Sequence, residues 1–401
     1  MENHPGRVPA DFHPGSRIEP RRQQKTRSLR KYRRIGSINR GFLCRGIDMR
    51  VYVISILWAA LCVSVPAYAQ EAREEGGCGG STFTFFQEND IYTGSDRDYT
   101  NGTRISWISP DLSSFRDDPR LPSWSHGLID ALPFTDGESF LKTVSLSVGQ
   151  NIYTPEDIDG IRRPGKDRPY AGISYLAFGF HSRNTRVMNT WEYSVGIIGP
   201  HSYAEDMQKA VHEWTNSDSP NGWEDQIRDE PILNVFYDRK WRIAPKHEPT
   251  GLSYDAIPHA GCAVGNALTE VTIGGQVRMG RNLPNDFGTL PIQPASDTNA
   301  PFDEQDPRLS EGSRRFSSVH AFVSVDTYAK LWDITLDGNF LRRGNGSEVD
   351  KEPFVAQLAG GIGITTGRFK ITYAYVTRTR EYETQNKRQA YGAVTVSYTL
   401  R

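Results

Sequence analysis

Polar residues suited to hydrolytic chemistry cluster where alternating segments of the sequence end or begin. In the stretch FFQENDIYTGSDRDYTNG, Asn89 and Asp90 end one such segment, and Thr100 lies near the start of the next. A carboxylate such as Asp90 can hold a divalent cation that polarises an ester carbonyl, and an amide such as Asn89 can donate to an oxyanion. His212 can accept a proton from water, and Gln208 precedes it by four residues, which is about one helical turn. Together these residue types suit the hydrolysis of an acyl ester.

Each of these residues also has an ordinary structural explanation. An Asp after Asn at a strand end is commonly part of an Asx turn, and His212 alone could be a surface residue of a helix. The sequence contains no GxSxG motif, so a serine hydrolase of that type is not supported. The convergence of several such residues therefore matters more than any single one.

A further polar segment, TPEDIDGIRRPGKDRPYAG, carries basic side chains. Its candidates for substrate binding are Arg162, Arg163, Lys166 and Arg168. At a membrane surface they could pair with the phosphates of lipopolysaccharide, which arginine binds well. The alternative is a set of solvated loop charges.

The N-terminal part contains one apolar stretch, RVYVISILWAALCVSVPAYAQ, that is typical of a secretory signal peptide. Its apolar core is too short to span a membrane comfortably, and Ala67 and Ala69 supply the small residues of a cleavage site. We therefore expect a signal peptide over residues 49–69, although an N-terminal anchor helix is the alternative. Residues 1–48 would be a non-functional or disordered basic extension, and residues 70–80 a flexible segment. The mature chain would keep Cys78 and Cys262, which could pair or stay apart.

The rest of the chain, residues 81–401, alternates with the period of two that is typical of β-strands. Besides the two segments that flank the opening stretch, the expected strands are 143–153, 172–182, 190–199, 232–241, 252–264, 270–280, 317–328, 354–364, 369–379 and 391–400. Residues 202–216 have a helical pattern instead, and residues 332–338 are expected to be a loop.

An exported chain with this alternation predicts an all-β fold, a closed antiparallel outer-membrane β-barrel of about twelve strands. A soluble sandwich or propeller is the alternative, and the absence of a fixed repeat disfavours a propeller. A formal net charge of -1 gives no electrostatic reason to expect nucleic acid as a partner.

Strand parity brings the polar clusters to one end of such a barrel. If both termini lie in the periplasm, the opening hairpin, the basic segment and the helix all lie on the extracellular side. The same parity places residues 111–142 and 281–316 on the periplasmic side, where turns are usually short. Each is therefore either a real insertion or a region that hides a strand pair.

Several long motifs resemble the outer-membrane lipid A 3'-O-deacylase family. They are END (88–90) with DRDYTNG (96–102), GQNIYTP (149–155), DRPYAG (167–172), and GIIGPHSYAEDMQKAVHEW (196–214) followed by GWEDQI (222–227). These motifs span about the first half of the mature chain, and the second half matches mainly as strand-like sequence.

The resemblance implies a twelve-stranded barrel whose calcium-dependent active site hydrolyses the 3'-linked acyl ester of lipid A. His212 would activate water with support from Gln208, and the cation would stabilise the oxyanion. Asn89, Asp90 and Thr100 would complete the site.

The resemblance also implies where calcium binds. Asp90 would be the principal ligand of Ca²⁺. Family members can place a glutamate six residues after the catalytic histidine, and Asp218 occupies that position in this chain. Asp218 is therefore the candidate for a second metal ligand.

Two other functions are compatible with the sequence. One is an outer-membrane phospholipase of broader specificity, and the other is a non-catalytic barrel that acts as a pore or an adhesin. A wide water-filled lumen would favour a pore, whereas a packed polar lumen would favour an enzyme. We expect a monomer in the cell outer membrane, in contact with its lipids and with lipopolysaccharide as substrate.

Overall fold

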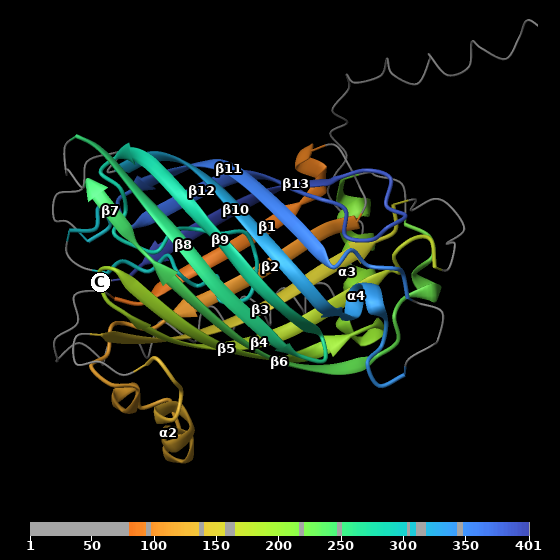
Figure 1. The fold of residues 1–401 in the computed structure, drawn as a ribbon, viewed down its shortest axis with the longest axis horizontal. Helices are drawn as coiled ribbons and strands as arrows, with labels where there is room; N and C mark the ends of the chain where they lie inside the picture. Colours follow the sequence, from red (N-terminus) through yellow and green to blue (C-terminus); the bar gives the residue numbers. More distant parts are fainter. Residues whose placement is uncertain are drawn as a thin grey trace, which may run out of the picture. The chain divides into compact units, whose positions relative to one another are not determined.

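The computed structural model describes residues 80–400 apart from 94–97, 136–139, 157–164, 216–219, 247–250, 303–304, 310–317 and 343–347. Its strands form one antiparallel sheet that closes on itself (Figure 1). In chain order they are β1 (Thr82–Asn89), β2 (Asp98–Ile108), β3 (Leu141–Thr154), β4 (Ala171–Arg183), β5 (Val187–Ile198), β6 (Glu230–Trp241), β7 (Ile243–Lys246), β8 (Leu252–Gly265), β9 (Leu268–Arg281), β10 (Ser318–Asp333), β11 (Phe354–Thr366), β12 (Phe369–Arg378) and β13 (Gln389–Thr399).

The sheet closes at two places that join distant parts of the chain. β1 pairs with β13, and β6 pairs with β8. The four-residue β7 follows β6 in the chain and pairs with the same strand, β8, so it does not count as a separate spanning strand. The barrel therefore has twelve spanning strands, and the expected closed antiparallel barrel is confirmed.

β10 shows how the alternating sequence produces a barrel with a polar interior. Ser324 and Asp326 are almost completely buried, whereas Val323 and Val325 are 54% and 49% exposed. Because successive side chains of a strand point to opposite faces, one face of β10 lines the lumen and the other faces outward. The outward faces of several strands carry exposed apolar side chains, among them Val271, Ile273, Val277, Leu358, Ile362 and Ile371. An apolar outer band around a polar lumen is typical of an outer-membrane barrel.

Helical segments lie at both ends of the barrel. α3 (Ala204–Thr215) and α4 (Ile334–Asp337) lie at one end, and α2 (Ser123–Asp130) and the C-terminus at the other (Figure 1). The expected helix is confirmed as α3. The expectation of a loop at 332–338 is wrong, because all but the last of these residues form the end of β10 and α4. None of the described helices is long and apolar enough to cross a membrane.

The strand register confirms that the three polar clusters share one end of the barrel, which we call the site end. Asn89 pairs with Asn101 there, Tyr153 pairs with Ala171, and Ile198 pairs with Glu230. Residues 111–142 connect β2 to β3 and residues 281–316 connect β9 to β10, both at the opposite end of the barrel. Their described parts add no spanning strand. In their described parts, both are therefore insertions and not missed strand pairs.

Residues 282–302, between β9 and β10, fold back into the barrel, and we call them the lumen plug (Figure 1). The segment doubles on itself, because the Phe287 N–H donates to the Thr298 carbonyl at 3.1 Å and the Phe302 N–H to the Asn285 carbonyl at 2.9 Å. Its polar groups bond to side chains that point inward from the wall. A lumen occupied in this way is the arrangement that favours an enzyme over a pore.

Two carboxylates hold the lumen plug in place. Asp297 accepts a hydrogen bond from Arg104 of β2 at 2.6 Å, and both side chains are buried. Asp286 pairs with Arg278 of β9 and Lys370 of β12, each at 2.6 Å, and with Arg308 at 2.9 Å. The lumen plug thus neutralises cations from strands that are distant in sequence.

The charges around Asp286 determine its ionisation. Burial alone would raise the pKa of this carboxyl group, but the charges of Lys370, Arg278 and Arg308 outweigh burial and hold the pKa well below its ordinary value. A depressed pKa in the folded state means that ionised Asp286 stabilises the fold at any pH above the ordinary value.

We predict that Asp286→Asn lowers the free energy of unfolding by roughly 3–5 kcal/mol, because it leaves buried cations without their carboxylate. Urea unfolding in detergent micelles measures this difference. It should stay constant from neutral pH down to the ordinary carboxyl pKa of 3.8 and shrink at lower pH.

The matched control is Asp130→Asn on α2, where an exposed carboxylate pairs with exposed Arg116. That variant should unfold like the wild type, since exposed ion pairs contribute little. Equal stability of Asp286→Asn and the wild type would show that the lumen plug does not depend on this carboxylate.

Candidate functional site

Asn89 ends β1 and holds the turn that follows it. Its Oδ1 accepts a hydrogen bond from the Ile91 N–H at 2.8 Å, so the Asx-type contact, the ordinary structural explanation for this pair, is present. Its Nδ2 donates to Oδ1 of the paired Asn101 at 3.3 Å. An amide nitrogen carries two N–H donors, so Asn89 has donor capacity beyond this bond.

Asp90 is the first residue of η1 (Asp90–Thr93) and is completely buried. Thr93 fastens this short helix, since its hydroxyl donates to the Asp90 carbonyl at 2.8 Å and its Oγ1 also lies 2.9 Å from the Ala390 carbonyl. η1 is thereby tied to the β13 side of the barrel, and the backbone of Asp90 is held at the site end.

Thr100 is the extra residue of a β-bulge in β2. Tyr99 pairs with Tyr153 and Asn101 with Ile152, so Thr100 has no partner in the register. Its hydroxyl lies 2.8 Å from the hydroxyl of Thr154 at the end of β3. Bulges re-aim side chains and are frequent next to active sites.

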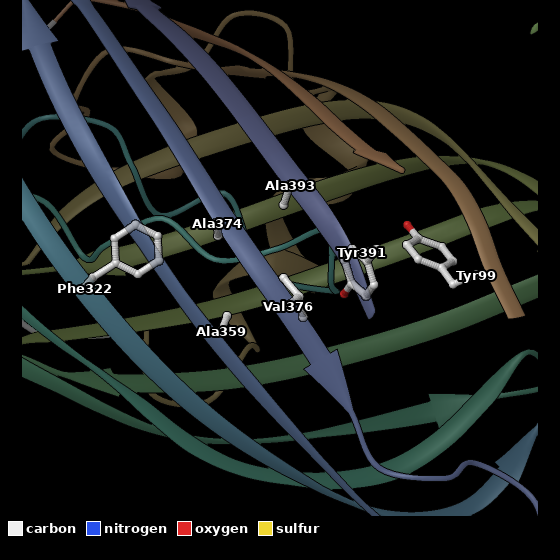
Figure 2. Close-up of a cluster of buried hydrophobic side chains, with 7 residues drawn as sticks. All are labelled: Tyr99, Phe322, Ala359, Ala374, Val376, Tyr391 and Ala393. Atoms are coloured by element: carbon white, nitrogen blue, oxygen red, sulfur yellow. The ribbon is translucent and has the colours of Figure 1, made fainter. Parts of the chain in front are cut away.

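Packing inside the barrel requires the tyrosine and the glycine of the DYTNG sequence, Tyr99 and Gly102. The Tyr99 ring lies in a buried cluster, with centroids 5.0 Å from Tyr391 and 5.3 Å from Tyr153. Figure 2 shows Tyr99 on β2 and Tyr391 on β13 side by side. A Cβ atom on Gly102 would lie 1.8 Å from the Tyr99 hydroxyl oxygen, so only glycine fits there.

α3 presents Gln208 and His212 on a buried face. Gln208 is 2% exposed and His212 is 3% exposed, so the interpretation of His212 as a surface residue is wrong. The Trp223 indole N–H donates to Gln208 Oε1 at 2.8 Å, which explains why GWEDQI accompanies the helix. Trp223 also stacks near Tyr170, with ring centroids 4.8 Å apart.

β3 connects the helix to the opening hairpin. Ile152 of β3 pairs with Asn101, which contacts Asn89, and Ile152 also packs in a cluster with Trp223 and Ala204 of α3. The segment just before α3 is bound to the wall, because the Ser202 carbonyl accepts from Gln150 Nε2 at 2.7 Å and from Ser174 Oγ at 2.8 Å. The separate polar clusters therefore form one continuous region at the site end.

The basic candidates do not share one environment. Lys166 is exposed, and its carbonyl accepts a hydrogen bond from the Thr384 hydroxyl at 2.6 Å. Arg168 is completely buried and pairs with Glu381 at 3.0 Å and with the Thr335 hydroxyl at 3.0 Å, so it does not share the exposed position of Lys166. The reason is a buried counter-charge that the local sequence does not reveal. Arg162, Arg163 and Asp218 lie outside the described residues.

Glu381, in the connection between β12 and β13, is a central residue that sequence reasoning missed. It accepts hydrogen bonds from Arg168 at 3.0 Å, Arg378 at 3.1 Å and Lys330 at 3.3 Å. Burial alone would raise the pKa of Glu381, but these three cations hold it well below the ordinary range. The alternation of charges in RTREYE was the available signal, although it is also typical of a solvated loop.

Tyr382 joins the same network to two of the motifs. Its hydroxyl donates to Asp167 Oδ1 at 2.9 Å and lies 3.4 Å from Asp98 Oδ1. The DRPYAG and DRDYTNG motifs are thus held together from the β12–β13 connection.

The side-chain oxygens at the site are of the types that bind calcium in proteins. Ca²⁺ prefers carboxylate, amide and carbonyl oxygens, and the Asp90 carboxyl group lies directly after the Asn89 amide. Within the described ranges, no three His, Cys, Asp or Glu side chains cluster as a metal site. Of the two carboxylates expected to bind calcium, Asp90 lies within the described residues and Asp218 does not.

Comparison with known proteins matches most of this chain to one family model and to solved outer-membrane barrels. The family model described as outer membrane protein LpxR matches residues 56–400. The structure of LpxR from Salmonella typhimurium aligns with a TM-score of 0.57 and 17% identity, covering 79% of this chain and 99% of that chain. The likeness supports the twelve-stranded fold.

Other structural matches are weaker. The β domain of the Bordetella autotransporter BrkA aligns with a TM-score of 0.37 and 10% identity, covering 80% of this chain and 100% of that chain. Similarity at that level indicates nothing specific about this chain. No curated protein matches the sequence.

We predict that Gly102→Ala destabilises the barrel by roughly 1–3 kcal/mol, because the added methyl group must displace the Tyr99 ring from its buried cluster. Urea unfolding in micelles measures the loss. Gly360→Ala is the matched control, since a Cβ atom there would meet only one carbonyl oxygen, at 4.0 Å. Equal effects of the two substitutions would contradict the proposed need for glycine at position 102.

Proposed function

The chain belongs to the family of outer membrane protein LpxR, as its motifs indicated, and we propose that it hydrolyses the 3'-linked acyl ester of lipid A. It is an outer-membrane β-barrel protein. The observation that carries the proposal is the continuous region at the site end, where the Asn89–Asp90 turn, the Thr100 bulge and the buried face of α3 are joined through β3.

In this proposal His212 is the general base. It takes a proton from water, whose oxygen attacks the ester carbonyl carbon. When the tetrahedral intermediate collapses, the bond to the glycolipid oxygen breaks, and the imidazolium returns the proton to that oxygen. The fatty acid and the free hydroxyl are the products, and the imidazole of His212 is neutral again.

Gln208 and Asn89 have supporting roles. Trp223 holds the Gln208 amide one turn before His212, which keeps the base on the buried face of α3. The second N–H of Asn89 is a suitable donor to the developing oxyanion. Thr100, held by Thr154, completes the wall beside them.

Asp90 is the proposed ligand of calcium, and Asp218 the proposed second ligand. When bound, calcium would supply positive charge for the carbonyl oxygen of the ester. Among the basic candidates, Lys166 is exposed and suits contact with a lipid A phosphate. Arg162 and Arg163 remain candidates for the same contact.

Mass spectrometry of lipid A from cells with and without the protein tests this function. Cells that carry the protein should contain lipid A that lacks the 3'-linked acyl group. Unchanged lipid A together with hydrolysed phospholipids would indicate a phospholipase of broader specificity instead.

We predict that Asp90→Asn abolishes deacylation while the barrel still folds, because an amide is a weak ligand for Ca²⁺. Chelation of wild-type protein should have the same effect, and added calcium should restore only the wild type. Asp206→Asn, an exposed position in the first turn of α3, is the control that should stay active. Full activity of purified wild-type protein in excess chelator would remove the cation from the mechanism.

We predict that His212→Gln lowers kcat by about a hundredfold to ten-thousandfold, the usual contribution of a general base. Release of the lipid A acyl chain measures turnover, and heat-modifiable gel migration reports folding. His201→Gln is the control, because His201 is exposed and pairs with Asp229 outside the proposed site. Near wild-type turnover of folded His212→Gln would assign the base to another residue.

A further inference from the structure

Glu88 immediately precedes the Asn89–Asp90 turn and contacts the lumen plug. It is 1% exposed, and its Oε1 accepts a hydrogen bond from the Ile292 backbone N–H at 2.5 Å. The two residues are 204 positions apart in the sequence. This bond joins the lumen plug to the strand end that carries the proposed calcium ligand.

Ile292 is held in place by bonds on both sides of it. The Thr289 carbonyl accepts from Gln276 Nε2 at 2.9 Å, and the Gln293 side chain accepts from the Tyr328 hydroxyl at 3.2 Å. Beyond these, the Ala295 N–H donates to Glu192 at 3.3 Å. The Ile292 N–H is therefore a donor in a fixed position and not part of a mobile loop tip.

The Ile292 side chain also approaches the hairpin of β1 and β2. Glu88 pairs with Gly102, and a Cβ atom on Gly102 would lie 3.2 Å from Ile292 Cδ1. The lumen plug thus contacts the hairpin through both its backbone and its side chain, on the lumen side of the site.

We propose that Glu88 is a positioning residue that uses the lumen plug to fix the Asn89–Asp90 turn. This inference rests on the proposed function. A buried carboxylate needs hydrogen bonds to offset its lost hydration, and the Ile292 N–H provides one from a rigid support. The backbone that leaves Glu88 enters η1 directly, so a fixed Glu88 limits the positions open to Asp90.

The test compares Glu88→Ala with Glu88→Gln. Glu88→Ala removes the acceptor and should lower kcat roughly tenfold to hundredfold with little change in KM, the effect of a small misplacement of reacting groups. Its affinity for calcium, measured by calorimetry with calcium chloride, should fall. Hydrogen exchange of residues 88–93 should become faster. Glu88→Gln keeps an oxygen that can accept from Ile292 and should stay close to the wild type in all three measurements.

The matched control is Thr84→Ala, on the same strand and facing the same lumen plug. The Thr84 hydroxyl accepts from Asn299 Nδ2 at 3.2 Å, away from the site end. This variant should keep wild-type kcat and calcium affinity. An equal loss in Thr84→Ala would mean that any weakened contact with the lumen plug impairs the protein, which overturns a specific role for Glu88.

Two further outcomes would overturn the proposal. One is folded Glu88→Ala with wild-type kcat, calcium affinity and hydrogen exchange. The other is Glu88→Gln as impaired as Glu88→Ala, because the charge and not the hydrogen bond would then be required. If Glu88→Ala does not fold, Ile292→Pro removes the same bond from the donor side, and the same measurements apply.

The experiment also separates this inference from the proposed function. If wild-type protein releases no acyl chain from lipid A, the proposed function fails. Hydrogen exchange of residues 88–93 and calcium affinity then still decide whether Glu88 and the lumen plug fix the turn.

Discussion

The neutralisation of buried charge inside the barrel is the constraint on which the rest of this structure depends. Arg104, Arg278 and Lys370 point into a lumen where an unpaired cation would cost several kcal/mol. Asp286 and Asp297 of the lumen plug supply the missing carboxylates. The wall and the lumen plug are therefore stable only together, and the same ion pairs that fill the lumen also fix the path of the plug.

A second network of the same kind closes the site end. Glu381 gathers Arg168, Arg378 and Lys330 from three different parts of the chain, and Tyr382 extends the network to Asp167 and Asp98. The motifs next to the proposed site are thus held by charge pairs from the β12–β13 connection. A preorganised site needs such support, because misplacement by about 1 Å can cost catalysis a hundredfold.

The site is formed by local irregularities in the strands and turns of an otherwise regular barrel. The Thr100 bulge, the η1 turn at Asp90 and the packing of α3 on β3 are local departures from an ideal barrel. Bulges at the rim of a sheet re-aim side chains without breaking the ladder on either side. This explains how a barrel wall built for a membrane also presents a cluster of polar groups at one end.

The sequence by itself determined the strands, because a period of two requires one face to be buried and sets the register within narrow limits. It also determined that the polar motifs share one end, since parity follows from the order of the strands. Only the tertiary structure decided that residues 282–302 enter the lumen, that Arg168 is buried against Glu381, and that Gly102 must leave room for Tyr99. The physical reason is that the partner of a buried charge or ring lies on a strand far away in sequence. A local pattern records the type of a side chain but not the counter-charge or the ring that it meets across the barrel.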